Sequence, residues 1–596
     1  MEQGKKVKKV RKRVSRRFVR LLVLSVVFAG LLLGMFVRVG YIKYVHGDEY
    51  EQAARLQQAA STDYVIPALR GNILDAKGEV LVQSVRCYNV ILDSKVLYEA
   101  TDKEKNSTVK MLCDILGLTD ADAIRKYYGE EYKEYRYLRL PGAQGIRTAE
   151  KEKLQQAVDD GSIVGVWFEE TQERQYPYDS LAAHILGFNG TYGVEQYYDA
   201  MLTGIQGRKM VVAGDKGSYV TEYTAAQDGP TLTLTLNATV QHSMETILAE
   251  AMQEYNVLQG SAICMNPQTG AVYGWCNMPT FSLQDVEKAI GVTPKYLENY
   301  SPEDADYYTR IWTNAGLSST YQPGSTYKPI FAAAALDEAL LGTGTTFECG
   351  GSMPFYDTRI RCHAGAVHGV QTLRQILCNS CNVGMTKISE LMSKQTYLKY
   401  QESFGVGQMT GIDLAGEVSA AGLIYTEDTM GPVELATSSF GQGFNVTPIQ
   451  LITAFSAVIN GGNVLRPYVV STVTDSKGNV VLQNERTVLR QAVSEETSAL
   501  IRSYLLDIVE EGGGGYARVD GYQIGGKTGT AEQGDYAERK YIVSFICYTP
   551  IENPEVVLLV VLDQNDSGTS ADASRTAGKM LKSILPVLGI YPEPEG

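Results

Sequence analysis

The chain has 596 residues, enough for more than two domains, and its 44% hydrophobic and 20% charged content is ordinary for a globular protein. The formal net charge is −14, although residues 1–20 contain ten Lys or Arg against Glu2 alone. The rest of the chain is therefore strongly acidic, which argues against nucleic acid as its partner. Nine cysteines without dense spacing argue against a disulfide scaffold.

The first predicted element is a membrane helix. The 17 residues Leu21–Val37 carry no charge and span roughly 26 Å as a helix, at the short end for a bilayer. Apolar residues beyond the flanking arginines extend the run. A cleaved signal peptide has a similar layout, but no small-residue cleavage site follows, so we predict an uncleaved signal-anchor over residues 21–42. The basic tail, residues 1–20, predicts a cytoplasmic N-terminus with the rest of the chain outside.

Residues 44–228 predict a separate domain. Residues 47–61 contain good helix formers and predict a helix. Residues 64–84 alternate apolar and polar around the turn signal Asp75–Gly78, which predicts a hairpin. Residues 100–160 are charged, with apolar residues at i, i+3 and i+4, and predict helices.

A new unit begins at residues 229–236, "GPTLTLTL", whose strict alternation predicts a strand. A predicted helix over 237–255 and a hairpin over 260–279 follow. This order differs from the strand–helix–strand alternation of a nucleotide-binding sheet. It favours an antiparallel arrangement instead.

Residues 321–330, "YQPGSTYKPI", contain the pattern S-x-x-K. Pro323 and Gly324 predict a turn, and a helix that starts at Ser325 places Lys328 on the same face. A serine hydroxyl needs a base to act as a nucleophile, and a lysine can serve if burial or another cation lowers its pKa. Because unrelated Ser/Lys pairs are common, the pattern is weak by itself.

Residues 378–384, "CNSCNVG", contain Ser380-Cys381-Asn382, an S-x-N pattern. Its hydroxyl can relay a proton, and its amide can bind a peptide carbonyl. The same stretch matches C-x-x-C through Cys378 and Cys381. Nearby His363 and His368 would permit a metal, but no second ligand pair follows, so we predict none. Elsewhere, Cys349 and Cys362 could pair as a disulfide.

Residues 521–533, "GYQIGGKTGTAEQ", allow two interpretations. Gly521 with Gly526-Lys527-Thr528 matches a phosphate-binding loop, which requires a helix directly afterwards. Lys527-Thr528-Gly529 also matches the K-T-G of acyl-transferring serine enzymes. Flanking residues 516–525 and 540–550 predict strands, so we favour K-T-G. On a strand, Lys527 and Gly529 face one side while Thr528 and Thr530 face the other.

Together, S-x-x-K, S-x-N and K-T-G, separated by 55 and 147 residues, resemble the penicillin-binding transpeptidases. Within that family the chain resembles the monofunctional class B enzymes of peptidoglycan synthesis, of division, elongation or sporulation type. The resemblance extends over roughly residues 38–590. It includes "RGNILDAKGEVL", "RQYPYDSLAAHILGF", "YGVEQYYDAMLTGIQG", "MNPQTGAVYGWCNMPTF", "SSFGQGFNVTPIQL" and "NGGNVLRP". The turn Asp75–Gly78 and the stretch "GGGGYAR" depart from the family pattern.

The resemblance implies an α+β penicillin-binding transpeptidase fold, with an antiparallel sheet flanked by helices. It also implies an elongated α+β pedestal and one transmembrane helix. The expected domains are a cytoplasmic tail (1–20), a signal-anchor (21–42), a non-catalytic, dimerisation-type pedestal (44–228) and a transpeptidase domain (229–590). Arg70, Asp75, His184 and Glu195 are expected to hold pedestal structure.

The resemblance also implies residue roles. Ser325 would attack the penultimate D-Ala carbonyl of a stem peptide and form an acyl-enzyme, with Lys328 as base. Ser380 would pass a proton to the leaving D-Ala, and Lys527 would help to keep Lys328 neutral. Substrate-binding roles fall to Asn382, Thr528, Gly529 and Thr530, with an oxyanion hole formed by the backbone N–H groups of Ser325 and Thr530.

By the same resemblance, the expected partners are peptidoglycan stem peptides, β-lactams that acylate Ser325, the membrane, and a polytopic SEDS-type glycan polymerase bound through anchor and pedestal. We expect no cofactor, no metal and no nucleic acid. Two alternatives stay open. One is a D,D-carboxypeptidase or β-lactamase-like hydrolase with water as acceptor, and the other is a non-catalytic cell-wall scaffold.

Overall fold

The computed structural model describes residues 16–45, 63–188, 190–213, 219–342, 344–533, 540–565 and 567–592. The chain divides into two compact units. The first unit joins residues 1–67 to 206–226, and the second joins 68–205 to 227–596. The helix predicted over residues 47–61 lies outside the described residues.

The first unit contains one long helix and a small sheet. Helix α1 (Arg16–Val45) includes the helix predicted over residues 21–42. Strands β1 (Asp63–Ile66), β6 (Gly207–Ala213) and β7 (Tyr219–Thr224) form an antiparallel sheet in the order β1-β6-β7. Across the described parts of the chain, no helix combines the length and the apolar character that a membrane crossing requires.

A seven-stranded sheet forms one part of the second unit, with the order β19-β18-β8-β2-β3-β4 and with β5 beside β3. Neighbouring strands are antiparallel, except that β2 runs parallel to β8. The predicted hairpin around residues 75–78 is confirmed as β2 and β3. The strands are β2 (Ile73–Leu74), β3 (Val80–Leu92), β4 (Leu138–Arg139), β5 (Val166–Gln175), β8 (Thr231–Leu234), β18 (Val470–Thr474) and β19 (Val480–Gln483).

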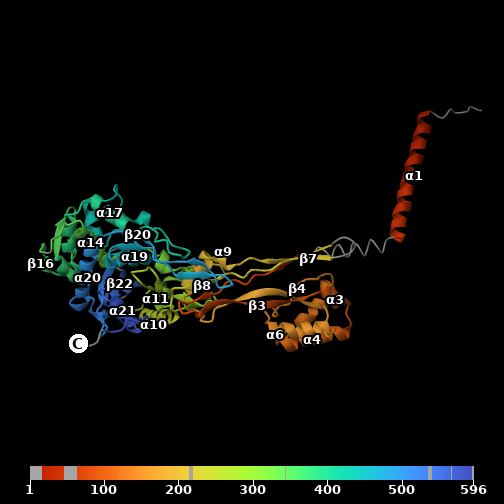
Figure 1. Cartoon of the computed structure of the whole chain (residues 1–596), viewed down its shortest axis with the longest axis horizontal. Helices are drawn as coiled ribbons and strands as arrows, with labels where there is room; N and C mark the ends of the chain where they lie inside the picture. The colour runs from red at the N-terminus through yellow and green to blue at the C-terminus, as the bar shows by residue number, and fades with distance from the viewer. Residues whose placement is uncertain are drawn as a thin grey trace, which may run out of the picture. The chain divides into compact units, whose positions relative to one another are not determined.

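Short helices pack beside β3 and β5 over their own apolar core, and Figure 1 shows α4 and α6 next to each other there. The helices predicted over residues 100–160 are confirmed for α4, α5 and α6. The prediction is wrong for residues 126–147, which form 3₁₀ turns, β4 and loops, because Gly129, Pro141, Gly142 and Gly145 interrupt helical geometry. These helices are α3 (Ser94–Glu99), α4 (Asp102–Leu116), α5 (Ala121–Arg125) and α6 (Thr148–Asp159). Three further helices contribute to the main core instead: α7 (Ala183–Leu186), α8 (Gly193–Tyr197) and α9 (Asp199–Leu202).

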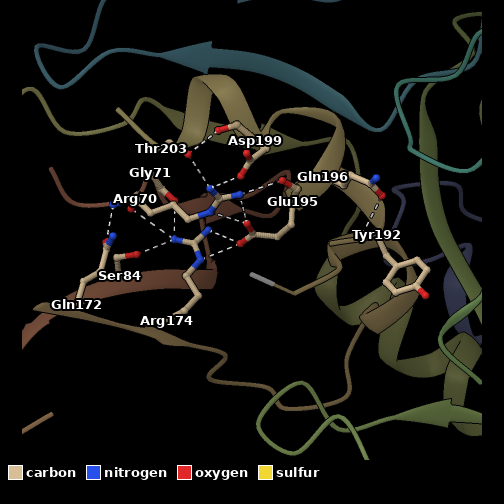
Figure 2. A network of polar contacts seen from close by, with 10 residues as sticks. All are labelled: Arg70, Gly71, Ser84, Gln172, Arg174, Tyr192, Glu195, Gln196, Asp199 and Thr203. Carbon is tan, nitrogen blue, oxygen red and sulfur yellow. Dashed lines mark hydrogen bonds and ion pairs between the residues drawn. The ribbon is translucent and has the colours of Figure 1, made fainter. Parts of the chain in front are cut away.

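Two arginines share one buried carboxylate between β2, β5 and α8 (Figure 2). Arg70 Nε donates to Glu195 Oε2 at 2.6 Å, and Arg174 Nε donates to Glu195 Oε1 at 2.8 Å. Arg70 also donates to Asp199 Oδ1 at 2.6 Å, and Arg174 Nη1 donates to the Gly71 carbonyl at 2.7 Å. Because Glu195 is fully buried, both of its oxygens depend on these arginines. The network ties together three segments far apart in the sequence.

Asp75 and His184 are likewise held by backbone groups. Asp75 Oδ1 accepts from the N–H of Lys77 at 2.8 Å, and its Oδ2 accepts from the N–H of Ala238 at 3.1 Å. His184 is buried and its Nε2 lies 2.8 Å from the Ile311 carbonyl oxygen. Burial lowers the pKa of His184 to about 4, so it is neutral near pH 7. These contacts agree with structural roles.

A five-stranded antiparallel sheet forms the other part of the second unit, in the order β10-β9-β23-β22-β21. The hairpin predicted over residues 260–279 is confirmed as β9 and β10, and the strand predicted over residues 540–550 is confirmed as β22. The strands are β9 (Gln259–Met265), β10 (Val272–Met278), β21 (Gly525–Gln533), β22 (Lys540–Thr549) and β23 (Val556–Asp563).

Strand alternation separates the two faces of this sheet into two cores. On β23, Val557 and Leu559 belong to one core, while Leu558 and Val560 belong to the other. Helices α10 (Ala238–Glu254) and α21 (Ala571–Ile584) cover the second face, while α19 (Pro448–Ile459) and α20 (Glu495–Glu510) cover the first, with α14 (Lys328–Asp337) against them. The predicted α+β architecture, an antiparallel sheet flanked by helices, is confirmed.

The strand predicted over residues 516–525 is wrong. Residues Gly515–Ala517 form a 3₁₀ turn, and β21 begins only at Gly525. Asp520-Gly521 is a turn signal, and Gly521 has φ +77°, which a strand does not accommodate.

The remaining elements of the second unit are short strands and helices. Two-stranded antiparallel sheets are formed by β11 (Thr280–Phe281) with β12 (Ala289–Ile290), β13 (Thr346–Cys349) with β16 (Gly369–Thr372), β14 (Ser352–Phe355) with β15 (Thr358–Arg361), and β17 (Asn463–Leu465) with β20 (Val488–Gln491). The other helices are α11 (Pro294–Asn299), α12 (Tyr307–Trp312), α13 (Ala315–Ser318), α15 (Leu373–Cys378), α16 (Asn382–Ser389), α17 (Lys394–Ser403) and α18 (Pro432–Ser438).

Candidate active site

Ser325 lies in a 3₁₀ turn, Gly324–Tyr327, that leads directly into α14. The predicted helix start is therefore confirmed, with a tighter first turn than expected. The N–H of Lys328 donates to the Ser325 carbonyl, so the two residues are one turn apart. Ser325 is partly exposed, whereas Lys328 is fully buried. A partly open hydroxyl thus sits one turn ahead of a desolvated amine.

Two glycines let this turn approach other backbone closely. Gly324 has φ +57°, and a Cβ there would lie 2.8 Å from the Thr530 carbonyl oxygen on β21. Gly441 has φ +81°, and a Cβ there would lie 2.0 Å from the Gly324 carbonyl oxygen. Any larger residue would push these segments apart. Both glycines are needed to place Ser325 beside β21.

The Lys328 amine is enclosed by oxygen atoms from the S-x-N segment. Its Nζ lies 2.6 Å from the Ser380 carbonyl oxygen, 3.1 Å from Ser380 Oγ and 2.8 Å from Asn382 Oδ1. Burial, and then the charge of nearby Lys527, hold the pKa of Lys328 well below its usual value. A neutral amine at this position can accept a proton.

Lys527 reaches the same serine from β21. It pairs across the sheet with Ile546, on the face covered by α19 and α20. Its Nζ lies 3.1 Å from Ser380 Oγ and 3.1 Å from the Thr528 carbonyl oxygen. Burial lowers the pKa of Lys527 to about 7. Ser380 Oγ therefore lies within hydrogen-bond distance of two buried amines.

The S-x-N segment forms the turn between α15 and α16. Ser380 adopts φ +49°, an uncommon conformation for a residue with a side chain, and the Cys381 side chain caps α16. Asn382 Nδ2 donates to the Arg361 carbonyl at 3.0 Å, which leaves Oδ1 directed at Lys328. This tight turn places the Ser380 carbonyl oxygen, Ser380 Oγ and Asn382 Oδ1 around the Lys328 amine.

The K-T-G strand lies against the serine turn. A Cβ on Gly529 would lie 2.8 Å from Thr326 Cγ2 and 2.5 Å from Ser544 Oγ, so only glycine fits. Thr528 and Thr530 are partly exposed. No helix follows Thr528, since β21 continues to Gln533, which is incompatible with a phosphate-binding loop.

The structure thus brings together all three predicted motifs. Lys328, Ser380, Asn382 and Lys527 are in direct contact, and the K-T-G strand approaches the turn that carries Ser325. Sequence reasoning missed the positioning role of Gly441, for which the G-Q-G within "SSFGQGFNV" was the available signal. It also missed that Cys349 and Cys362 lie beside Cys381 and His368.

Comparison with known proteins assigns a class to this fold and site. The family model "Penicillin binding protein transpeptidase domain" matches residues 260–585, and "Penicillin-binding Protein dimerisation domain" matches residues 65–191. The chain belongs to the penicillin-binding protein transpeptidase family, and within it to the class B enzymes, as the sequence motifs predicted.

Among its relatives, Stage V sporulation protein D of Bacillus subtilis is 33% identical over 97% of this chain and 88% of its own length. The probable peptidoglycan D,D-transpeptidase FtsI of Caulobacter vibrioides is 27% identical over 88% of this chain and 82% of its own. The crystal structure of penicillin binding protein 2X from Streptococcus thermophilus shares the fold, with a TM-score of 0.73 at 22% identity, over 88% of this chain and 80% of that one.

Proposed function

We propose that this chain is a serine-type D,D-transpeptidase that crosslinks peptidoglycan stem peptides through an acyl-enzyme on Ser325, and that β-lactams block it at the same residue. The observation that supports this most directly is that two buried amines, those of Lys328 and Lys527, flank the half-buried hydroxyl of Ser380. The three motifs meet around it, at the N-terminal end of the helix that follows Ser325. The names of the relatives, peptidoglycan D,D-transpeptidases, agree with this activity.

In the acylation step, neutral Lys328 accepts the Ser325 proton as Oγ attacks the penultimate D-Ala carbonyl carbon. Developing negative charge on the carbonyl oxygen is stabilised by the backbone N–H groups of Ser325 and Thr530. The C–N bond to the terminal D-Ala then breaks, and Ser380 passes a proton to the departing amine. Lys527 keeps the proton affinity of Lys328 low, because two adjacent amines cannot both be charged at little cost.

Substrate binding falls to the rim of the site. Asn382 binds the donor amide, and Thr528 and Thr530 bind the terminal carboxylate beside Gly529, where a side chain would obstruct the strand. An amine from a second stem peptide then attacks the acyl carbon, forms the crosslink and releases Ser325. A hydrolase would use water in this step, and a scaffold would not acylate.

The test labels the purified chain with a fluorescent penicillin. We expect covalent labelling of the unchanged chain and of Ser503→Ala, whose serine lies on the exposed side of α20. Ser325→Ala should lose the label entirely. Retained labelling of Ser325→Ala would exclude Ser325 as nucleophile, and absence of labelling in the unchanged chain would favour the scaffold.

A second assay separates transpeptidase from hydrolase. The chain is incubated with a D-Ala-D-Ala-like thioester donor and a D-amino acid acceptor. We expect the acceptor to be incorporated and to suppress hydrolysis as its concentration rises. Product formed only by hydrolysis would favour the D,D-carboxypeptidase or β-lactamase-like alternative.

The proposed setting is the cell membrane. The basic tail (1–20) and the uncharged run within residues 21–42 support a single-pass anchor with a cytoplasmic N-terminus and an extracellular catalytic domain. Pedestal (44–228) and anchor would contact a SEDS-type glycan polymerase, and transpeptidation would reside in residues 229–590. Fractionation of cells with the full chain and with a chain lacking residues 1–45 tests the anchor, since only the full chain should stay with membranes after an alkaline wash.

A further inference from the structure

A cluster of three cysteines and one histidine lies directly behind the S-x-N turn. It consists of Cys349, Cys362, His368 and Cys381, and their potential ligand atoms all lie within 4.8 Å of one another. The three cysteines are buried and His368 is half-buried. All three are free thiols. Of the residues that the sequence pattern suggested, Cys381 and His368 belong to the group, whereas Cys378 and His363 do not.

We propose that these four side chains bind one zinc ion. Zinc prefers four tetrahedral ligands drawn from cysteine thiolate and histidine nitrogen, and a Cys₃His set is a common structural combination. With Zn–S near 2.3 Å and Zn–N near 2.0 Å, a tetrahedral site separates two sulfurs by about 3.8 Å, and a sulfur and a nitrogen by about 3.5 Å.

The observed separations fit this geometry. Cys362 Sγ lies 3.6 Å from Cys349 Sγ and 3.6 Å from Cys381 Sγ, and Cys349 Sγ lies 3.4 Å from His368 Nδ1. A disulfide requires about 2 Å between its sulfurs and joins only two of the three. A shared tetrahedral ion accounts for all four side chains at once.

Hydrogen-bond donors surround the sulfurs, as a thiolate site requires. The N–H of Gly351 donates to Cys349 Sγ at 3.4 Å, and the N–H of Gly384 donates to Cys381 Sγ at 3.2 Å. Cys381 also caps the N-terminus of α16, where the helix dipole favours a thiolate. Such hydrogen bonds orient metal ligands and stabilise their anionic form.

A buried amide adds an independent indication. Gln371 is 1% exposed, and within the described residues its Nε2 meets no conventional hydrogen-bond acceptor. Its side chain instead lies within hydrogen-bonding reach of Cys381. Its Oε1 is held by Asn379 at 2.9 Å, which fixes the amide with its N–H groups toward the cluster. An amide held in this way suits a negatively charged sulfur.

The ion would have a structural task beside the active site. All four positions of the tetrahedron are filled by the chain, so no open position would remain for substrate. The ligands come from the end of β13, the residue after β15, the residue before β16 and the cap of α16. Cys381 lies between Ser380 and Asn382, whose oxygens contact Lys328. Zinc would therefore fasten the S-x-N turn to the two small sheets.

The test measures metal directly. The full chain is purified in reducing buffer, and zinc is counted by mass spectrometry of the element. We expect about one zinc per chain in the unchanged protein and in Cys378→Ser, the matched control that alters the other cysteine of the C-x-x-C pattern. Cys349→Ser should lose zinc, with affinity lowered more than about 100-fold, because losing only a hydrogen-bond partner of a ligand already costs 10–100-fold. Gln371→Ala should weaken binding by roughly 10–100-fold.

A spectroscopic measurement keeps the test decisive if a variant does not fold. Zinc is removed from the unchanged chain with a chelator, and Co²⁺ is added under reducing, oxygen-free conditions. Tetrahedral thiolate-bound cobalt should give its intense visible bands together with sulfur-to-cobalt charge transfer, saturating at one equivalent and displaced by Zn²⁺. Absence of these bands in the reduced chain, or equal zinc in Cys349→Ser and the unchanged chain, would overturn the proposal.

Discussion

Two lysine amines are buried around a single serine hydroxyl, and this arrangement opposes folding while it favours chemistry. Lys328 is fully buried and Lys527 is 1% exposed, and neither forms a salt bridge within the described residues. Apolar side chains at these two positions would favour the stability of the fold more than buried amines do. Burial instead keeps at least one amine neutral, and a neutral amine is what general-base catalysis requires.

Lys527 makes the stability of the chain depend on pH. Its pKa is about 7 when folded and 10.5 in an exposed lysine, so between these values the unfolded chain binds one proton more than the folded chain. The free energy of unfolding therefore rises with pH across this window, by up to about 1.4 kcal/mol per pH unit. When the free energy of unfolding is measured with urea over this pH range, it should rise less steeply with pH in Lys527→Met than in the unchanged chain. Lys399→Met, which alters an exposed lysine, should keep the original slope; equal slopes in all three chains would contradict a buried neutral Lys527.

At the scale of elements, single residues determine how closely segments meet. The 3₁₀ turn before α14 reaches β21 because Gly324 and Gly529 present no side chain between them. Strands β2 and β5 of the seven-stranded sheet are connected to α8 and α9 by Glu195 and by the two arginines that bind it, Arg70 and Arg174. In both places the contact between elements depends on the chemical identity of two or three residues.

Glu195→Gln tests the second of these contacts. The substitution leaves Arg70 and Arg174 buried without their shared negative charge, and removing one partner of a buried ion pair costs about 3–5 kcal/mol. We expect denaturant unfolding of this variant to begin at clearly lower urea. Asp199→Asn alters a carboxylate whose side chain is 51% exposed, and it should cost less than about 1 kcal/mol. Equal losses in the two variants would show that Glu195 contributes no more than a surface contact.

The amino-acid sequence predicted local elements better than it predicted contacts between distant segments. The hairpin at Asp75–Gly78, the hairpin of β9 and β10, and strand β22 were predicted correctly, because strand alternation and turn residues are local signals. The strand over 516–525 was not, because Gly521 outweighed its apolar neighbours. The three motifs were found by their order, and the structure places them together. The cluster of Cys349, Cys362 and Cys381 was missed because successive cysteines are 13 and 19 residues apart, and they meet only where two small sheets pack against α16.

At the scale of the whole molecule, the seven-stranded sheet takes strands from both sides of the predicted boundary at residue 228. Strand β8 lies between β2, which precedes the boundary, and β18, which follows it. The inter-strand hydrogen bonds of β8 are therefore completed only when residues 68–92 are present. This sheet makes the N-terminal and catalytic regions of the second unit interdependent in folding.

A truncation series tests that interdependence. A fragment that starts at residue 229 leaves the N–H and C=O groups on one edge of β8 without their partner β2, a condition that promotes aggregation. We expect this fragment to be largely insoluble, whereas a fragment that starts at residue 68 should be soluble and should bind fluorescent penicillin. Equal solubility and labelling of both fragments, measured after size-exclusion chromatography, would contradict the role of the shared sheet.

The parallel pairing of β2 with β8 also constrains how such a chain can be recombined with its relatives. A hybrid gene joined at the apparent domain border would take β2 from one parent sequence and β8 from the other. The side chains of these two neighbouring strands would then have to pack together although they come from different proteins. Viable hybrids should instead inherit the β2–β3 hairpin and β8 from the same parent, so this sheet, rather than the linear order of domains, sets the unit of exchange.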